Sequence, residues 1–85
     1  MWKTPITKRI RREQKNIARI SKKHHALLVR SRKVSMDFRN GTIFEVEFEV
    51  RNRKVQKEIQ AVVRNLNNAI ERLETLLMEE DKGFL

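Results

Sequence analysis

Residues 33–50 read KVSMDFRNGTIFEVEFEV, and this stretch decides which fold the sequence predicts. Apolar residues alternate with polar ones on both sides of Asn40-Gly41, at Val34, Met36, Phe38, Phe44, Val46, Phe48 and Val50. Alternation with a period of two is typical of a strand with one buried face, and Asn-Gly between two such runs is typical of a tight turn between strands. The stretch therefore predicts a β-hairpin over residues 33–50.

The register of this hairpin follows from the need to keep one face apolar. A three-residue loop that ends at Gly41, with Gly41 in the left-handed region, pairs Met36 with Phe44 and Val34 with Val46. A slip by one residue would expose the whole apolar set. We therefore expect the phenylalanines of the hairpin to lie in the core, with a base-stacking platform as the alternative.

The segments on either side have helical periodicity. Residues 5–31 place apolar side chains at steps of three and four, with Glu13 and His24 filling two positions of the row, and predict a basic amphipathic helix. Asn52 is the expected N-cap of a second helix over residues 53–81. Its heptad-type row, typical of a coiled coil, runs without a break through Val55, Ile59, Val62, Leu66, Ala69, Leu73 and Leu76.

Together these elements predict an α+β fold, helix–β-hairpin–helix, as one small domain over residues 1–85 with antiparallel helices. Two strands alone are marginally stable and a chain of this length buries a modest core, so we expect dimerisation or a small homo-oligomer to complete the fold. The expected oligomer interface consists of Ile59, Val62, Leu66, Leu73, Leu76 and Leu77. The element order resembles that of a shortened prefoldin-type subunit, and this resemblance implies an assembly role.

Charge is distributed unevenly along the chain, whose formal net charge is +9. Residues 1–34 contain 12 Lys/Arg and a single acid, Glu13, whereas residues 35–85 contain 8 Lys/Arg and 10 acids. Like charges at helical spacing repel one another, and a nucleic-acid backbone is the commonest partner that offsets such repulsion. The candidate nucleic-acid-binding residues are Lys8, Arg11, Arg12, Lys15, Arg19, Lys22, Lys23 and Arg30.

These features predict a small basic protein that binds nucleic acid through its backbone with weak sequence selectivity, as a homodimer or oligomer. Helix-turn-helix, zinc-finger and basic-zipper patterns are missing from the sequence, and DNA and RNA remain equal candidates. Asn65, Asn67 and Asn68 could read base edges, but their neighbours on the second helix are not basic enough, so we interpret them as solvated. The alternative function is a scaffold, adaptor or small inhibitor whose basic stripe docks an acidic protein.

Other classes of function lack their sequence signatures. The chain has no Cys, and no nucleophile–base pair or phosphate-binding loop is apparent, so we expect neither an enzyme nor a cofactor. His24 and His25 are adjacent and would point about 100° apart on a helix, which does not suit one metal ion. No apolar run is long enough to span a bilayer. We expect a cytoplasmic or nucleoid-associated protein, with an organelle-targeting presequence or a membrane anchor at Trp2 as alternatives.

Overall fold

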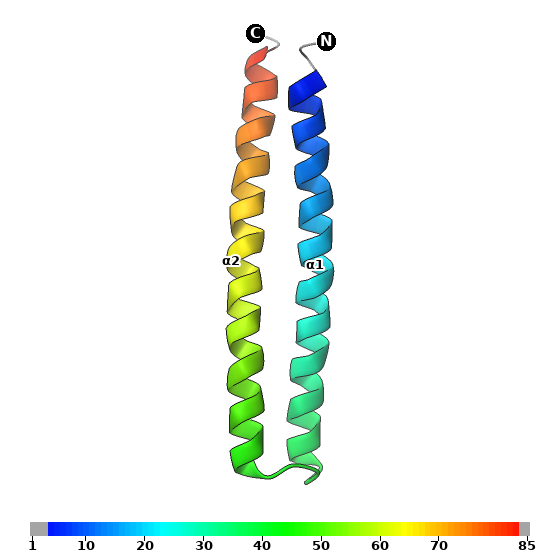
Figure 1. The fold of residues 1–85 in the computed structure, drawn as a ribbon, viewed down its shortest axis with the longest axis vertical. Helices are drawn as coiled ribbons and strands as arrows, with labels where there is room; N and C mark the ends of the chain where they lie inside the picture. The colour runs from blue at the N-terminus through cyan, green and yellow to red at the C-terminus, as the bar shows by residue number, and fades with distance from the viewer. Residues whose placement is uncertain (1–3, 84–85) are drawn as a thin grey trace.

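The computed structural model describes residues 4–83, which form two long helices. Helix α1 spans Thr4–Arg39 and helix α2 spans Glu45–Gly83. The helices lie side by side and antiparallel, so that the start of α1 and the end of α2 are at the same end of the molecule (Figure 1). The Cα positions extend over 61 × 14 × 14 Å, and the fold is a helical hairpin.

The predicted α+β fold is therefore wrong, because residues 4–83 contain no strand and the segment predicted as a β-hairpin belongs mostly to the two helices. Val34 and Phe38 are four residues apart, so a short alternating run also places them on one helical face. Val34 is buried, whereas Met36 between them is 51% exposed. A β-face would have turned both toward the core, so the helical period accounts for the pattern of burial. Because the described residues contain no hairpin strands, the observed element order does not resemble that of a prefoldin-type subunit.

Asn40-Gly41 ends α1 and does not connect strands. Gly41 has the predicted left-handed conformation, with a φ of 76°. Its N–H donates to the carbonyl of Phe38 at 3.1 Å, and the N–H of Thr42 donates to the carbonyl of Asp37 at 2.8 Å. These two bonds form a Schellman motif, in which glycine after the last helical turn satisfies carbonyls that have no partner within the helix. The same dipeptide is thus compatible with a hairpin turn and with a helix end.

Helix α2 begins eight residues before the start predicted at the Asn52 cap. The carbonyl of Phe44 accepts a hydrogen bond from the N–H of Phe48 at 2.8 Å, and Glu45 and Glu47 lie in the first turn. Acidic side chains there interact favourably with the positive end of the helix dipole. The predicted N-cap Asn52 lies inside the helix and is half-buried.

The heptad-type rows of the two helices form one continuous seam. They extend through the segment predicted as strands, because Ser31, Val34 and Phe38 continue the row of α1 and Phe48 and Asn52 begin that of α2. The rings of Phe38 and Phe48 stack with centroids 4.4 Å apart and planes 18° apart, which fixes the register of the helices. The buried side chains are Ile10, Leu27, Val34, Ile43, Val55, Val62, Ala69 and Leu76. The core is therefore a single layer between two helices.

We predict that Gly41→Ala destabilises the protein by about 1 kcal/mol, because a side chain disfavours the left-handed conformation. No atom lies within 4 Å of the position of the added Cβ, so the cost comes from the backbone alone. In a chain of this size the melting temperature should fall by about 4–8 °C, measured by circular dichroism at 222 nm. Asn40→Ala is the control, since Asn40 is exposed and its φ is not positive. Equal melting temperatures for the Gly41 variant and the wild type would contradict this role of the glycine.

Candidate nucleic-acid interface

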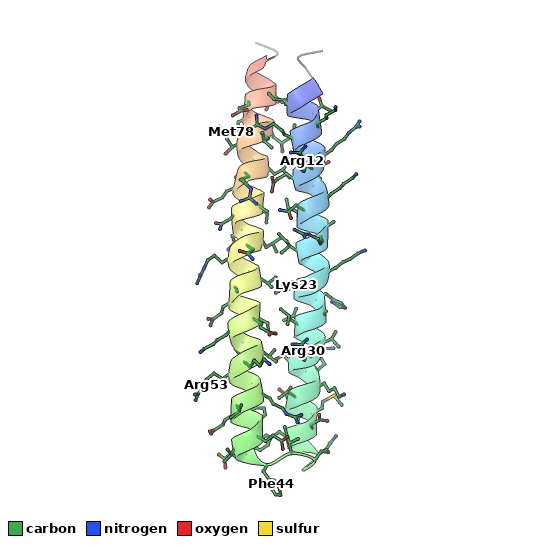
Figure 2. All side chains as sticks on the ribbon, viewed as in Figure 1. Arg12, Lys23, Arg30, Phe44, Arg53 and Met78 are labelled. Atoms are coloured by element: carbon green, nitrogen blue, oxygen red, sulfur yellow. The ribbon has the colours of Figure 1, made fainter. Side chains whose placement is uncertain are left out.

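All eight residues predicted to bind nucleic acid lie on α1 and are exposed. Since α1 is a single helix, Lys8 and Arg30 are about 33 Å apart along its axis at 1.5 Å per residue. Figure 2 shows Arg12, Lys23 and Arg30 at successive levels along this helix. The sequence prediction thus placed these residues on one element and at its surface.

The pairing with α2 divides the eight residues into two rows. Arg12, Arg19, Lys23 and Arg30 line grooves between the two helices, and we call them the groove row. The remaining residues, which we call the outer row, are not among the lining residues of these grooves: they are Lys8, Arg11, Lys15 and Lys22. Three of the outer-row lysines are spaced seven residues apart and therefore lie on one face of α1.

The groove nearest the ends of the chain is rich in cations. Two adjoining hollows share Asn68 and Arg72, and together they form what we call the basic groove. Its polar lining contains five Lys/Arg and two acids: Arg9, Arg12, Arg19, Lys23, Arg72, Glu13 and Glu71, together with the amides of Asn16, Asn65 and Asn68. The groove thus combines an excess of positive charge with hydrogen-bonding side chains from both helices.

Most polar residues of this groove were not predicted from the sequence as parts of a site, among them Arg9, Arg72, Asn65 and Asn68. The two asparagines were interpreted as solvated because α2 itself offers few cations near them. Two of their basic neighbours, Arg19 and Lys23, come from α1 across the groove, and Arg72 comes from α2. One signal was present in the sequence, because Arg51, Glu58, Asn65 and Arg72 recur every seven residues beside the buried row of α2.

The only acid of the first 34 residues is neutralised inside the groove. Nε of Arg72 donates to Oε1 of Glu13 at 3.1 Å, and Nη2 of Arg72 forms an ion pair with the same oxygen at 3.0 Å. Nδ2 of Asn16 also donates to this oxygen, at 3.3 Å. The hydrogen bond from Arg72 is the main reason that the pKa of Glu13 lies below its usual value. Glu13 is thus an acceptor for Arg72 and leaves no unbalanced negative charge on the basic part of α1.

Two residues of the groove row also have partners within the chain. Arg30 forms an ion pair with Glu58 at 2.9 Å, which neutralises its charge. Arg19 donates to Oδ1 of Asn16 at 2.7 Å, and this neutral partner leaves its charge in place. Arg12, Arg19 and Lys23 are therefore the predicted residues that give the basic groove its charge.

Within the described residues, the aromatic side chains lie near the loop and the histidines lie in α1. Phe38 and Phe48 stack on each other near the loop, whereas Phe44 is 85% exposed and points away from both helices (Figure 2). His24 is half-buried and His25 is exposed, and residues 4–83 contain no cluster of three or more potential metal ligands. In the same residues no helix is long and apolar enough to cross a membrane. Trp2 lies outside the described residues.

We predict that the Glu13–Arg72 pair makes stability depend on pH. Because folding lowers the pKa of Glu13, its contribution is complete above the ordinary value of 4.5 and is lost as the pH falls through the lower folded value. Arg72 is 54% exposed, so solvent screening limits the contribution to about 0.5–1 kcal/mol.

Urea unfolding at pH 7 and at pH 3 measures this effect in the wild type and in Glu13→Gln. The variant should be less stable than the wild type at pH 7 and should approach it at pH 3. Glu74→Gln, which removes an exposed carboxylate, is the control and should keep the wild-type pH dependence. An equal difference between Glu13→Gln and wild type at both pH values would rule out the ion pair as its cause.

Comparisons with the models of known protein families, with curated proteins and with solved structures found no match to this chain.

Proposed function

We propose that the chain binds nucleic acid through the phosphate backbone, using the basic groove and the outer row, and that it does so as a homodimer or small oligomer. The observation that supports this most directly is the Glu13–Arg72 pair. The single acid of the basic segment is matched by a cation from the other helix, so no unpaired acid of α1 lies among the cations between Lys8 and Lys33.

The chemistry of the side chains fits phosphate. Arginine can donate two parallel hydrogen bonds to a phosphate, and lysine acts as a compact point charge. A straight helix with cations at intervals over about 33 Å can contact several phosphates of a duplex, each contact releasing a condensed counterion. Contacts of this kind position a protein on the backbone and carry little sequence information.

The two rows make a test by charge reversal possible. Arg12→Glu with Arg19→Glu alters the basic groove, and Lys8→Glu with Lys15→Glu alters the outer row. Lys54→Glu with Lys57→Glu is the matched control, because both lysines are exposed on α2, outside the basic groove and the outer row, and the change in net charge is the same. Sedimentation first checks that this control associates as the wild type does. Binding to a random-sequence duplex DNA and to a matched duplex RNA is measured over a range of salt concentrations.

We expect the wild-type affinity to fall steeply with salt, with a slope that corresponds to about five or more phosphates. Each reversal on α1 should weaken binding at least tenfold and flatten the slope by about one unit per lost contact, whereas the control should change affinity less than threefold. An equal loss in the control would mean that net charge alone governs binding. Negligible binding of the wild type at physiological salt would contradict the proposal and favour an acidic protein as the ligand of the same surface.

A further inference from the structure

Helix α2 carries a second apolar row that α1 covers only in part. Val55, Val62, Ala69 and Leu76 are at most 6% exposed and form the side that faces α1. Beside them runs what we call the free apolar face, whose residues are half-buried or exposed: Ile59, Val63, Leu66, Ile70, Leu73 and Leu77. Such a width of apolar surface is typical of a helix with neighbours on two sides.

The free apolar face and the basic groove lie on opposite flanks of the seam. On a helix, the residue after a buried position is rotated by about 100° to one side, and the residue before it by the same angle to the other. Val63 and Ile70 follow Val62 and Ala69, which places them on one flank. Glu58, which pairs with Arg30, and Arg72, which pairs with Glu13, lie on the other flank. One flank thus holds both ion pairs between the helices, whereas the other has a single weak polar contact near the loop, from Nε2 of Gln56 to Oγ of Ser31 at 3.4 Å.

The area of the hairpin is sufficient for association. A compact chain of 10.2 kDa exposes about 5,300 Å², from the usual scaling of surface with mass. This chain exposes 7208 Å², an excess of about 1,900 Å². A specific interface of ordinary size requires about 800 Å² from each partner. The excess accommodates an interface of this size.

The distribution of charge along α2 indicates that a second copy of α2 covers the free apolar face, and that it packs antiparallel. Residues 51–64 contain five Lys/Arg and one acid, whereas residues 71–81 contain five acids and one Arg. Two copies of α2 packed in parallel would bring like charges together, and two antiparallel copies bring each basic half against an acidic half. Glu79, Glu80 and Asp81 also lie unfavourably at the negative end of their own helix dipole, and the partner's basic half would offset this.

We propose that two hairpins associate through the free apolar face of α2, antiparallel, about a two-fold axis that passes near Leu66. This register places Val63 against Ile70 of the partner subunit and Ile59 against Leu73 of the partner subunit. At the rim of the same face, Arg53 meets Asp81 of the partner subunit. The inference rests on the self-associating part of the proposed function, and it does not depend on nucleic-acid binding because the basic groove lies on the other flank.

Of the six residues predicted as the oligomer interface, this geometry uses Ile59, Leu66, Leu73 and Leu77. Val62 and Leu76 are 4% and 6% exposed within one hairpin, so they belong to its internal seam. Val63 and Ile70, each 37% exposed, replace Val62 and Leu76 in the proposed interface.

The first experiment compares two apolar-to-acid substitutions on the same half of α2. Ile70→Glu places a charge in the free apolar face, and Met78→Glu places one on a side chain that is 61% exposed and points away from α1 (Figure 2). In sedimentation equilibrium we expect a wild-type dimer, a dissociation constant at least tenfold higher for Ile70→Glu, and a change of less than threefold for Met78→Glu. Circular dichroism checks that both variants remain helical. A monomeric wild type, or equal effects of the two substitutions, would overturn the proposal.

The second experiment tests the direction of packing. The chain has no Cys, so single cysteines introduced by Arg53→Cys and by Asp81→Cys are the only thiols present. With a short bifunctional thiol reagent, a mixture of the two variants should give the crosslinked heterodimer, and each variant alone should give little product. Product from each variant alone would establish a parallel arrangement, and no product in the mixture, from chains that sediment as dimers, would exclude this face. Neither result depends on nucleic acid, so failure of DNA or RNA binding leaves this inference to be judged separately.

Discussion

The register between α1 and α2 is the constraint on which every other feature of the hairpin depends. It is set where the chain reverses direction, because the Schellman motif at Gly41 ends α1 and the stacked rings of Phe38 and Phe48 close the first layer. From there the two heptad-type rows meet layer by layer up to the ends of the chain. One residue more in the loop would shift α2 against α1 and separate Glu13 from Arg72.

The helical parts of the fold could be predicted from the sequence, because the apolar steps of three and four in residues 5–31 and 53–81 fit no other regular structure. The central stretch could not, for two physical reasons. Val34 and Phe38 share a face in a strand and in a helix alike, and Asn-Gly serves a hairpin turn and a helix C-terminus equally well. A long seam favours one continuous helix on each side of Gly41. Its length becomes apparent only when the polar residues Ser31 and Asn52 are counted as positions of the heptad-type rows.

The candidate site, too, could be predicted from the sequence only in part. The positions of the eight cations on one exposed helix followed from their spacing. The contribution of Arg72 and of the asparagines of α2 depends on a partner helix at a particular register, and a β-hairpin between the helices would have placed them elsewhere. The ion pair with Glu13 is likewise a contact between residues 59 positions apart.

A core only one layer thick also determines how the chain folds. Contact between Phe38 and Phe48 closes a short loop and therefore costs little chain entropy. If Glu13 and Arg72 came into contact first, they would close a loop about six times longer, at a higher entropic cost. Each layer that forms shortens the loop that the next contact must close, so we expect the helices to pair progressively from the turn toward the start of α1 and the end of α2. Opening proceeds in the reverse order, and slow amide hydrogen exchange should therefore be concentrated near the turn, with the end that carries the basic groove exchanging first.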